Sequence, residues 1–537
     1  MIRLARMVTL LATVLWLLVV AGGWSPARAK ERIWREYRSA HFIVRSNAPR
    51  KQAHRLIRDL EWYRHVVGRI TNIDFSYSDA PLRLWAWATF DGYLHATGAY
   101  GTGGFYNMGL DGAYALMTVQ PARNPREIDG RQIILHEYTH HLIHQFSPLQ
   151  YPRWYDEGFA EFLSTMQFGK DGSIVLGGPL WRAAVLRDFD WVPFRELMES
   201  KGQYMTQHRV SMRDPRRARP ATDLQYAEGW ITVHYLMTHP QRRKQIQTYL
   251  SLMNRPDVND EDAFEQAFQT TYKKLQKEVY QYFWDMKLPR LGITVPDLPK
   301  VAVNERKLSA TEGAFQNVEA MLVAGDYEGR GAKNWDALVK LYEAGVRPAD
   351  MAYYLARTAL AVEKRRDAFP RWLAAYEKAG GSKAVIASLK ARKALDDIFG
   401  LKRSFAKPVT LSDRTGLHDL RRALKKAMLA DPGDPRPHYF YCLTFAYTDD
   451  EKPDRQAMAS IGIVRDRLPD VEGGKIVEAI LLAKSGERDR ALAQLQVMQR
   501  WAFSNGEREF LGKVARRIEK MPIAADAAGR AKTSKGR

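Results

Sequence analysis

The chain is predicted to fold as an α+β domain followed by an all-α domain. Up to about residue 300, short runs with the alternating apolar pattern of β-strands are interspersed with amphipathic helical patterns, and beyond residue 310 only helical periodicity is found. The length of 537 residues supports this division, because a single hydrophobic core rarely grows beyond roughly 250–300 residues. We therefore expect the first domain to span residues 30–300 and the second to span residues 301–520.

Three strands and one long helix are expected in the first domain. The strand pattern is found at His41–Arg45, Leu82–Ala88 and Ala113–Val119, and an amphipathic helix covers Lys51–Val67. The last of these strands comes just before the most informative motif of the chain.

The second domain is expected to consist of pairs of short amphipathic helices. The turns at Ala324–Tyr327 and Ser485–Asp489 resemble those of tetratricopeptide repeats, although no clean period of about 34 residues can be laid over the region. A solenoid-like helical bundle would offer a concave surface to a protein partner or would buttress the first domain. The expected helices are Trp335–Ala344, Ala349–Val362, Ala368–Ala379, Leu417–Ala430, Val477–Lys484 and Arg488–Met498.

Residues 1–29 have the pattern of a cleaved secretory signal. Two arginines precede an apolar run, Val8–Ala21, and Ala27-Arg28-Ala29 has the small residues of a cleavage site. The run is shorter than the roughly eighteen residues of a membrane-spanning helix. The chain has one cysteine, Cys442, so no intramolecular disulfide can form, which fits a bacterial periplasm better than a disulfide-rich extracellular scaffold.

The chain is strongly basic. Its net charge is +21, and because Arg3, Arg6 and Arg28 lie in the signal, the expected mature chain carries +18. This charge favours anionic envelope polymers, anionic lipid or acidic peptides as partners. Nucleic acid is not expected, because the basic residues are spread along the chain without a nucleic-acid-binding motif. Residues 521–537 are expected to form a disordered basic tail. The basic segment 206–220 is either a lid that selects acidic substrates or an ordinary solvated loop.

The most informative motif is an HExxH sequence formed by His136, Glu137 and His140. Residues four apart lie on one face of an α-helix, so the two histidines can direct imidazole nitrogens at one metal ion. Glu137 is placed to take a proton from a metal-bound water. A catalytic zinc needs a third protein ligand, and the candidate is Glu157, on a second helix that begins after a proline-containing turn. Glu161, one turn later, is expected to accept the spare N–H of a ligand histidine.

An HExxH sequence alone also occurs by chance on solvated helices. Here the downstream helix adds a Glu-Gly-x-Ala-Glu segment at ligand distance, which favours a zinc site. His144 continues the four-residue spacing, but about 12 Å of helix axis separates it from His136, so the three histidines cannot share one ion. We expect His144 to support the ligands or to belong to the core, and His141 to lie off the metal face.

The HExxH motif and the segment that follows it resemble the gluzincin clan of metallopeptidases, in particular the bacterial peptidase-MA-like domains. The matching residues of the second segment are Trp154, Glu157, Gly158, Ala160 and Glu161. The resemblance implies a zincin-like metallopeptidase domain that binds one Zn²⁺ per chain. It also implies that both motif histidines and Glu157 are the zinc ligands and that Glu137 is the general base.

The same resemblance implies two further features. Family members have a tyrosine beyond the third ligand whose hydroxyl stabilises the oxyanion, and Tyr226 matches it. The alternative is a partly buried tyrosine that packs at the end of a core helix. An edge strand lines the substrate cleft in this clan, and 113–119 is expected to be that strand. Residues 112–118 lack the glutamate of the aminopeptidase strand motif, so the resemblance does not extend to aminopeptidases.

The expected function is that of a secreted or periplasmic zinc-dependent metallopeptidase that acts on a peptide or protein. Two alternatives stay open. One is a catalytically silent envelope scaffold that binds partners through the helical repeats, and the other is a zinc amidase that acts on cell-wall peptides. Glu137 argues against the silent scaffold, because an inactive copy does not need a base.

Overall fold

The computed structural model describes residues 32–521, apart from 77–79, 100–101, 125–126, 128, 148, 170–171, 204, 206, 212–217, 286, 296 and 324–331. The expected signal, residues 1–29, lies outside the described residues, as does the expected basic tail except for Met521. Met521 is buried against the last helices. Within the described ranges, no helix combines the length and the apolar character needed to cross a membrane.

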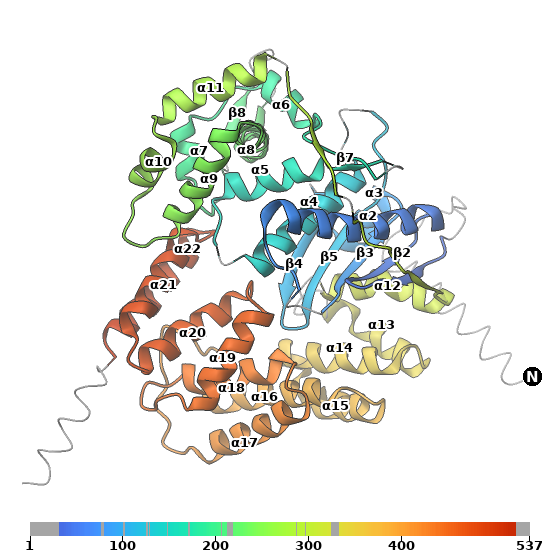
Figure 1. The fold of residues 1–537 in the computed structure, drawn as a ribbon. Helices are drawn as coiled ribbons and strands as arrows, with labels where there is room; N and C mark the ends of the chain where they lie inside the picture. The colour runs from blue at the N-terminus through green and yellow to red at the C-terminus, as the bar shows by residue number, and fades with distance from the viewer. Residues whose placement is uncertain are drawn as a thin grey trace, which may run out of the picture.

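A mixed six-stranded sheet forms one layer of the amino-terminal half (Figure 1). The neighbouring strands β2, β3 and β5 are parallel, and the outer strands pair antiparallel. In sheet order the strands are β11 (Asn304–Lys307), β1 (Arg35–Arg38), β2 (Phe42–Ser46), β3 (Leu82–Trp87), β5 (Gly112–Thr118) and β4 (Gly104–Gly109). The three predicted strands are confirmed to within one residue. The sheet extends past the boundary predicted at residue 300, because β11 pairs with β1.

The strand at the edge beside β5 is β4, so the prediction that 113–119 forms the edge strand is wrong. β5 lies between β3 and β4, and Asn107 of β4 stands opposite Tyr114 of β5. The sequence of β4, GFYNMG, contains two glycines and one asparagine, residues that have low strand propensity. Its pattern in the sequence is therefore weak, although the pairing with β5 is continuous.

Helices α2–α11 accompany the sheet. They are α2 (Arg50–Thr71), α3 (Phe90–Thr97), α4 (Gly130–Phe146), α5 (Arg153–Ser164), α6 (Arg182–Asp188), α7 (Phe194–Glu199), α8 (Ala221–Thr238), α9 (Pro240–Met253), α10 (Asp260–Phe268) and α11 (Tyr272–Trp284). The helix predicted at Lys51–Val67 is confirmed as part of α2. A small second sheet has the order β10 (Leu291–Ile293), β7 (Ile174–Leu176) and β6 (Gln167–Phe168).

Both faces of the six-stranded sheet are covered. Because side chains alternate along a strand, Leu84 and Ala86 of β3 join the large core that includes residues of α2 and α4. Trp85 and Trp87 belong to a separate cluster on the other face, together with residues of α3 and α12. The sheet is thus a buried platform, and α4 lies on it (Figure 1).

Helices α5 and α8 cross closely above the sheet layer. A Cβ atom on Gly158 of α5 would lie 2.9 Å from the Cα of Gly229 in α8, and closer still to the Gly229 carbonyl group. Only glycine fits this approach, which explains the Gly in the Glu-Gly-x-Ala-Glu segment. Since Glu157 precedes Gly158, the crossing also determines where Glu157 points.

The carboxy-terminal region is helical, as predicted. Its helices are α12 (Ala310–Val323), α13 (Ala332–Glu343), α14 (Pro348–Ala361), α15 (Phe369–Lys378), α16 (Lys383–Phe399), α17 (Thr415–Ala430), α18 (Pro435–Ala446), α19 (Arg455–Arg467), α20 (Glu472–Lys484), α21 (Arg488–Arg500) and α22 (Asn505–Glu519). The six predicted helices correspond to α13, α14, α15, α17, α20 and α21, whereas α12, α16, α18, α19 and α22 were not predicted. The resemblance to tetratricopeptide repeats stays a prediction.

This helical region contacts both layers of the amino-terminal half (Figure 1). At the sheet, Arg45 Nη1 lies 2.9 Å from Glu319 Oε2 of α12. At the helical layer, Arg500 at the end of α21 donates a 2.7 Å hydrogen bond to the Met253 carbonyl at the end of α9. Trp501 is part of the core of the amino-terminal half. The two layers are therefore joined to each other through the carboxy-terminal helices as well as directly.

Candidate metal centre

The amino end of α4, the helix that carries the HExxH motif, is fixed by the sheet. The Asp129 carboxylate caps the helix by accepting a 2.9 Å hydrogen bond from the Arg131 N–H. Gly130 N–H donates to the Gln120 carbonyl at 2.8 Å. A Cβ on Gly130 would lie 2.6 Å from the carbonyl carbon of Val119, just after β5. The position of every motif residue along α4 is therefore set by this junction.

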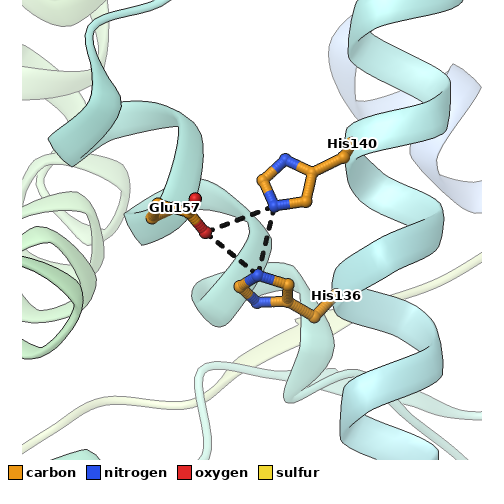
Figure 2. A group of neighbouring side chains, drawn as sticks. All are labelled: His136, His140 and Glu157. Carbon is orange, nitrogen blue, oxygen red and sulfur yellow. Dashed lines mark hydrogen bonds and ion pairs between the residues drawn. The ribbon is translucent and has the colours of Figure 1, made fainter. Parts of the chain in front are cut away.

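Three side chains from α4 and α5 converge on one point (Figure 2). The Nε2 atoms of His136 and His140 lie 3.1 Å apart, and Glu157 Oε2 lies 3.1 Å from the first and 3.3 Å from the second. Zinc bonds of roughly 2.0–2.2 Å in a tetrahedron place ligand atoms about 3.3–3.6 Å apart. The three atoms therefore fit one ion with a small outward adjustment. The described residues thus contain a buried group that could hold a metal ion.

The charges of this group follow from burial and mutual contact. Burial opposes a charge on Glu157, but the two histidines, through charge and hydrogen bonds, hold the pKa of its carboxyl well below the usual value. Burial likewise opposes a charge on His140, but the carboxylates of Asp156 and Glu157 raise the pKa of its imidazole well above the usual value. Negative charge is therefore concentrated behind and beside the histidines, where it attracts a cation.

Glu137 lies beside the three converging residues and is not one of the predicted metal ligands. Its Oε2 accepts a 2.8 Å hydrogen bond from the backbone N–H of Tyr106 in β4. Burial raises the pKa of the Glu137 carboxyl above its usual value, although the positive charge of the nearby histidines lowers it. A carboxyl group with a raised pKa suits the exchange of protons near neutral pH. The contact also ties the edge strand to α4.

The structure reveals a carboxylate that the sequence analysis missed, Asp156. Its Oδ1 lies 3.0 Å from His140 Nδ1 and 3.1 Å from His144 Nε2. Its Oδ2 lies 3.3 Å from Arg153 Nη1. A carboxylate behind a ligand histidine fixes the orientation and tautomer of the ring. The sequence contained a signal, because His144 repeats the four-residue spacing of the motif and Asp156 directly precedes Glu157. His140, His144 and Asp156 are also close enough to share a cation.

Glu161 does not make the hydrogen bond to a histidine that was expected. Its Oε1 lies 4.0 Å from His136 Nδ1, beyond hydrogen-bond distance. It accepts a 2.8 Å hydrogen bond from Arg182 Nε instead. Sequence spacing alone gave no sign of Arg182, which comes from α6. Glu161 therefore faces the predicted ligand without a hydrogen bond to it.

Tyr226 of α8 is brought against the site. Its half-buried ring stacks on His136, with ring centroids 6.1 Å apart and planes at 20°. The guanidinium carbon of Arg182 lies 4.6 Å from the centroid of the same ring. This places the tyrosine next to a predicted ligand, and its role as an oxyanion donor stays a prediction.

His141 belongs to the packing of α4. Its ring stacks on Tyr138 with centroids 5.6 Å apart, and its Nδ1 lies 3.4 Å from the Tyr106 hydroxyl. Burial lowers the pKa of His141 to about 3. It is therefore a neutral histidine, and it is not one of the three residues that converge.

The basic segment 206–220 includes a short hairpin. β8 (His208–Val210) pairs antiparallel with β9 (Ala218–Pro220), which leads directly into α8. Arg209 Nη2 lies 2.8 Å from Glu196 of α7. Residues 212–217, between the two strands in sequence, lie outside the described residues, so the proposed lid or substrate selector stays a prediction.

No protein-family model matches the chain, and no curated protein matches it. The resemblance to gluzincin metallopeptidases stays a prediction based on the two motifs. The function is therefore inferred from the chemistry of the site itself.

Proposed function

We propose that the protein is a zinc-dependent metallopeptidase whose metal ligands are His136, His140 and Glu157 and whose general base is Glu137. The observation that carries the proposal is the convergence of two imidazole nitrogens and one carboxylate oxygen within 3.1–3.3 Å of one another. Structural zinc sites are usually closed by four protein ligands, whereas three protein ligands leave a position for water or substrate. The donor set therefore supports hydrolysis.

The residues around the group support a division of catalytic roles. A zinc ion held there would supply the Lewis acidity that polarises a scissile carbonyl and acidifies water. Glu137 would accept the proton of the attacking water on its carboxylate and return it to the leaving amine. Its hydrogen bond with the Tyr106 N–H orients the carboxyl group for both transfers. Tyr226 would donate its hydroxyl to the developing oxyanion.

The edge of the sheet supports an extended peptide as substrate. Within the part of the chain that the structure describes, β4 has β5 on one side and no strand on the other. A peptide can add to such an edge through backbone hydrogen bonds. Tyr106 marks the point where this edge meets the site, because its N–H reaches Glu137. Hydrolysis of an amide in a cell-wall peptide would use the same residues, so the choice between these substrates needs an assay.

The test compares the zinc content and peptide hydrolysis of three proteins: the wild type, His140→Ala and Glu137→Gln. We expect about one zinc per wild-type chain and loss of zinc in His140→Ala. Glu137→Gln should keep its zinc and lose about 10²–10⁴ in rate, the range typical of general acid–base catalysis. The matched controls are His95→Ala and Glu265→Gln, both at exposed positions.

The possible outcomes separate the proposed function from its alternatives. Absence of zinc after reconstitution, or full activity of Glu137→Gln, would contradict the metallopeptidase. Zinc binding with no hydrolysis of a peptide library or of cell-wall peptides would favour the silent scaffold. Hydrolysis of cell-wall peptides alone would favour the amidase.

A further inference from the structure

Asp156, the carboxylate behind His140, is also held by His144 and Arg153. These two partners line a cavity of about 530 Å³ that lies between the amino-terminal half and the carboxy-terminal helices. Asp156 itself is only 4% exposed, so water cannot easily replace the contacts that it makes. Whatever positions His144 and Arg153 therefore also positions the carboxylate that orients His140.

His144 is contacted from the helical region by Asp470. This aspartate lies in the turn before α20, which is closed by a 3.1 Å hydrogen bond from the Val471 N–H to the Leu468 carbonyl. Asp470 Oδ2 lies 3.6 Å from His144 Nδ1. The other ring nitrogen, Nε2, lies 3.1 Å from Asp156 Oδ1. Each nitrogen of one imidazole thus faces a carboxylate, and the ring plane is fixed from both sides.

Arg153 is contacted from the helical region by Phe503. The guanidinium carbon lies 4.4 Å from the centroid of the Phe503 ring. Arg153 Nη1 lies 3.3 Å from Asp156 Oδ2 and 3.4 Å from Glu157 Oε1. Phe503 therefore covers a guanidinium that reaches both the orienting carboxylate and a predicted metal ligand.

The position of Phe503 is determined by its surroundings. Its N–H donates a 2.7 Å hydrogen bond to Glu507 Oε2. Ser504 Oγ accepts from the Glu507 N–H at 3.1 Å and so caps the start of α22. The chain just before Phe503 packs tightly on the amino-terminal half, because a Cβ on Gly202 would collide with the Trp501 carbonyl oxygen. The aromatic ring is thus held over Arg153 by a docked segment.

We propose that the carboxy-terminal helical region supplies two positioning residues, Asp470 and Phe503, to the metal centre. The proposal rests on the metal-binding function proposed above. Asp470 acts through His144 and Phe503 acts through Arg153, and both act on Asp156 behind a ligand histidine. The helices thereby help to retain the metal, beyond covering the catalytic half or binding a partner.

The expected effect is moderate because neither residue touches a ligand directly. Changes to residues that orient metal ligands typically cost about 10–100-fold in metal affinity. The side chain of Asp470 is 31% exposed and Phe503 is 60% exposed, so solvent weakens both contacts. We therefore expect the loss of both contacts to lower the metal affinity by about tenfold, near the lower end of this range.

The test measures zinc release from the full-length protein into an excess of a chromogenic chelator. The variants are Asp470→Asn, Phe503→Leu and the two combined. Asp466→Asn and Leu429→Ala, at exposed positions of the same helical region, are the controls. We expect the combined variant to release zinc about tenfold faster than the wild type, the controls to match the wild type, and the thermal unfolding midpoints of the metal-free proteins to agree.

A double-mutant cycle separates positioning from a general structural effect. In a His144→Gln background, Asp470→Asn should cause no further acceleration of zinc release, because its effect passes through His144. The proposal would be overturned if the combined variant released zinc at the wild-type rate. It would also be overturned if Asp470→Asn had an equal effect with and without His144. A wild-type chain that binds no zinc would overturn the metal centre as well. Zinc binding without peptide hydrolysis would remove the peptidase and leave the positioning role intact.

Discussion

Gly158→Ala is expected to weaken the fold and the proposed metal centre together. Gly158 follows Glu157 on α5, at the crossing with α8. The new Cβ would lie 2.9 Å from the Cα of Gly229 and closer to its carbonyl group. Unbonded carbon atoms are most favourably about 3.5–4.0 Å apart. Because the obstacle is backbone and cannot rotate away, the two helices must separate by roughly 1 Å.

Two magnitudes follow from this displacement. Overpacking of a close-packed interior typically costs about 1–3 kcal/mol, and the interior here is dense, since Trp154 and Trp230 on the same two helices are fully buried. The displacement also moves Glu157 Oε2 away from the histidine nitrogens, which now lie 3.1 and 3.3 Å from it. We expect zinc affinity to fall by about 10–100-fold, as for other changes that misplace a ligand.

Urea unfolding of the metal-free protein measures the first effect, and competition with a chelator measures the second. Gly292→Ala is the matched control, because a Cβ at that glycine has no atom within 4 Å. If Gly158→Ala unfolds and binds zinc as the control does, the crossing of α5 and α8 does not determine the position of Glu157.

Three further predictions concern single side chains. Asp156→Asn should lower zinc affinity by about 10–100-fold in a chelator competition, and unchanged affinity would contradict its orienting role. Tyr226→Phe should lower kcat by about 10²–10³ with little change in KM or zinc content, whereas a loss of zinc would indicate a packing role. Burial raises the pKa of Glu228 well above its usual 4.5, although the Val192 N–H lowers it. The folded state therefore binds this proton more tightly than the unfolded chain does, so the stabilisation is complete below pH 4.5 and is lost as pH rises toward the folded pKa. Glu228→Gln should gain stability relative to the wild type between pH 4.5 and 7 in urea unfolding, and a constant difference across that range would refute this.

The converging donor set could be predicted because its geometry is largely local. His136 and His140 share a helix face through spacing alone, and Glu157 follows on the next helix after a short turn. The position of Asp156 is not local in this sense. Adjacent residues on an α-helix are rotated by about 100°, so Asp156 points in another direction than Glu157. No local rule decides whether such a residue faces solvent or His140. The packing of α5 on α4 determines that Asp156 faces His140.

Features that depend on distant contacts could not be predicted. Glu161 has the correct helical spacing from Glu157, but Arg182 binds its carboxylate. β4 has a weak strand pattern and is defined by its pairing with β5. Asp470 and Phe503 reach the site from a region that the sequence assigns to a separate domain. Their contacts arise only when the two halves of the chain dock.

The pairing of β1 with β11 determines when the sheet can be completed. β1 lies near the start of the chain, whereas its outer neighbour is Asn304–Lys307. Until that segment arrives, β1 exposes an unpaired edge, the kind of surface that pairs with other chains and leads to aggregation. Contacts between residues so distant in sequence also form slowly, because a long loop must close first. We therefore expect the converging side chains of α4 and α5 to assemble early in folding and β11 to join the sheet last.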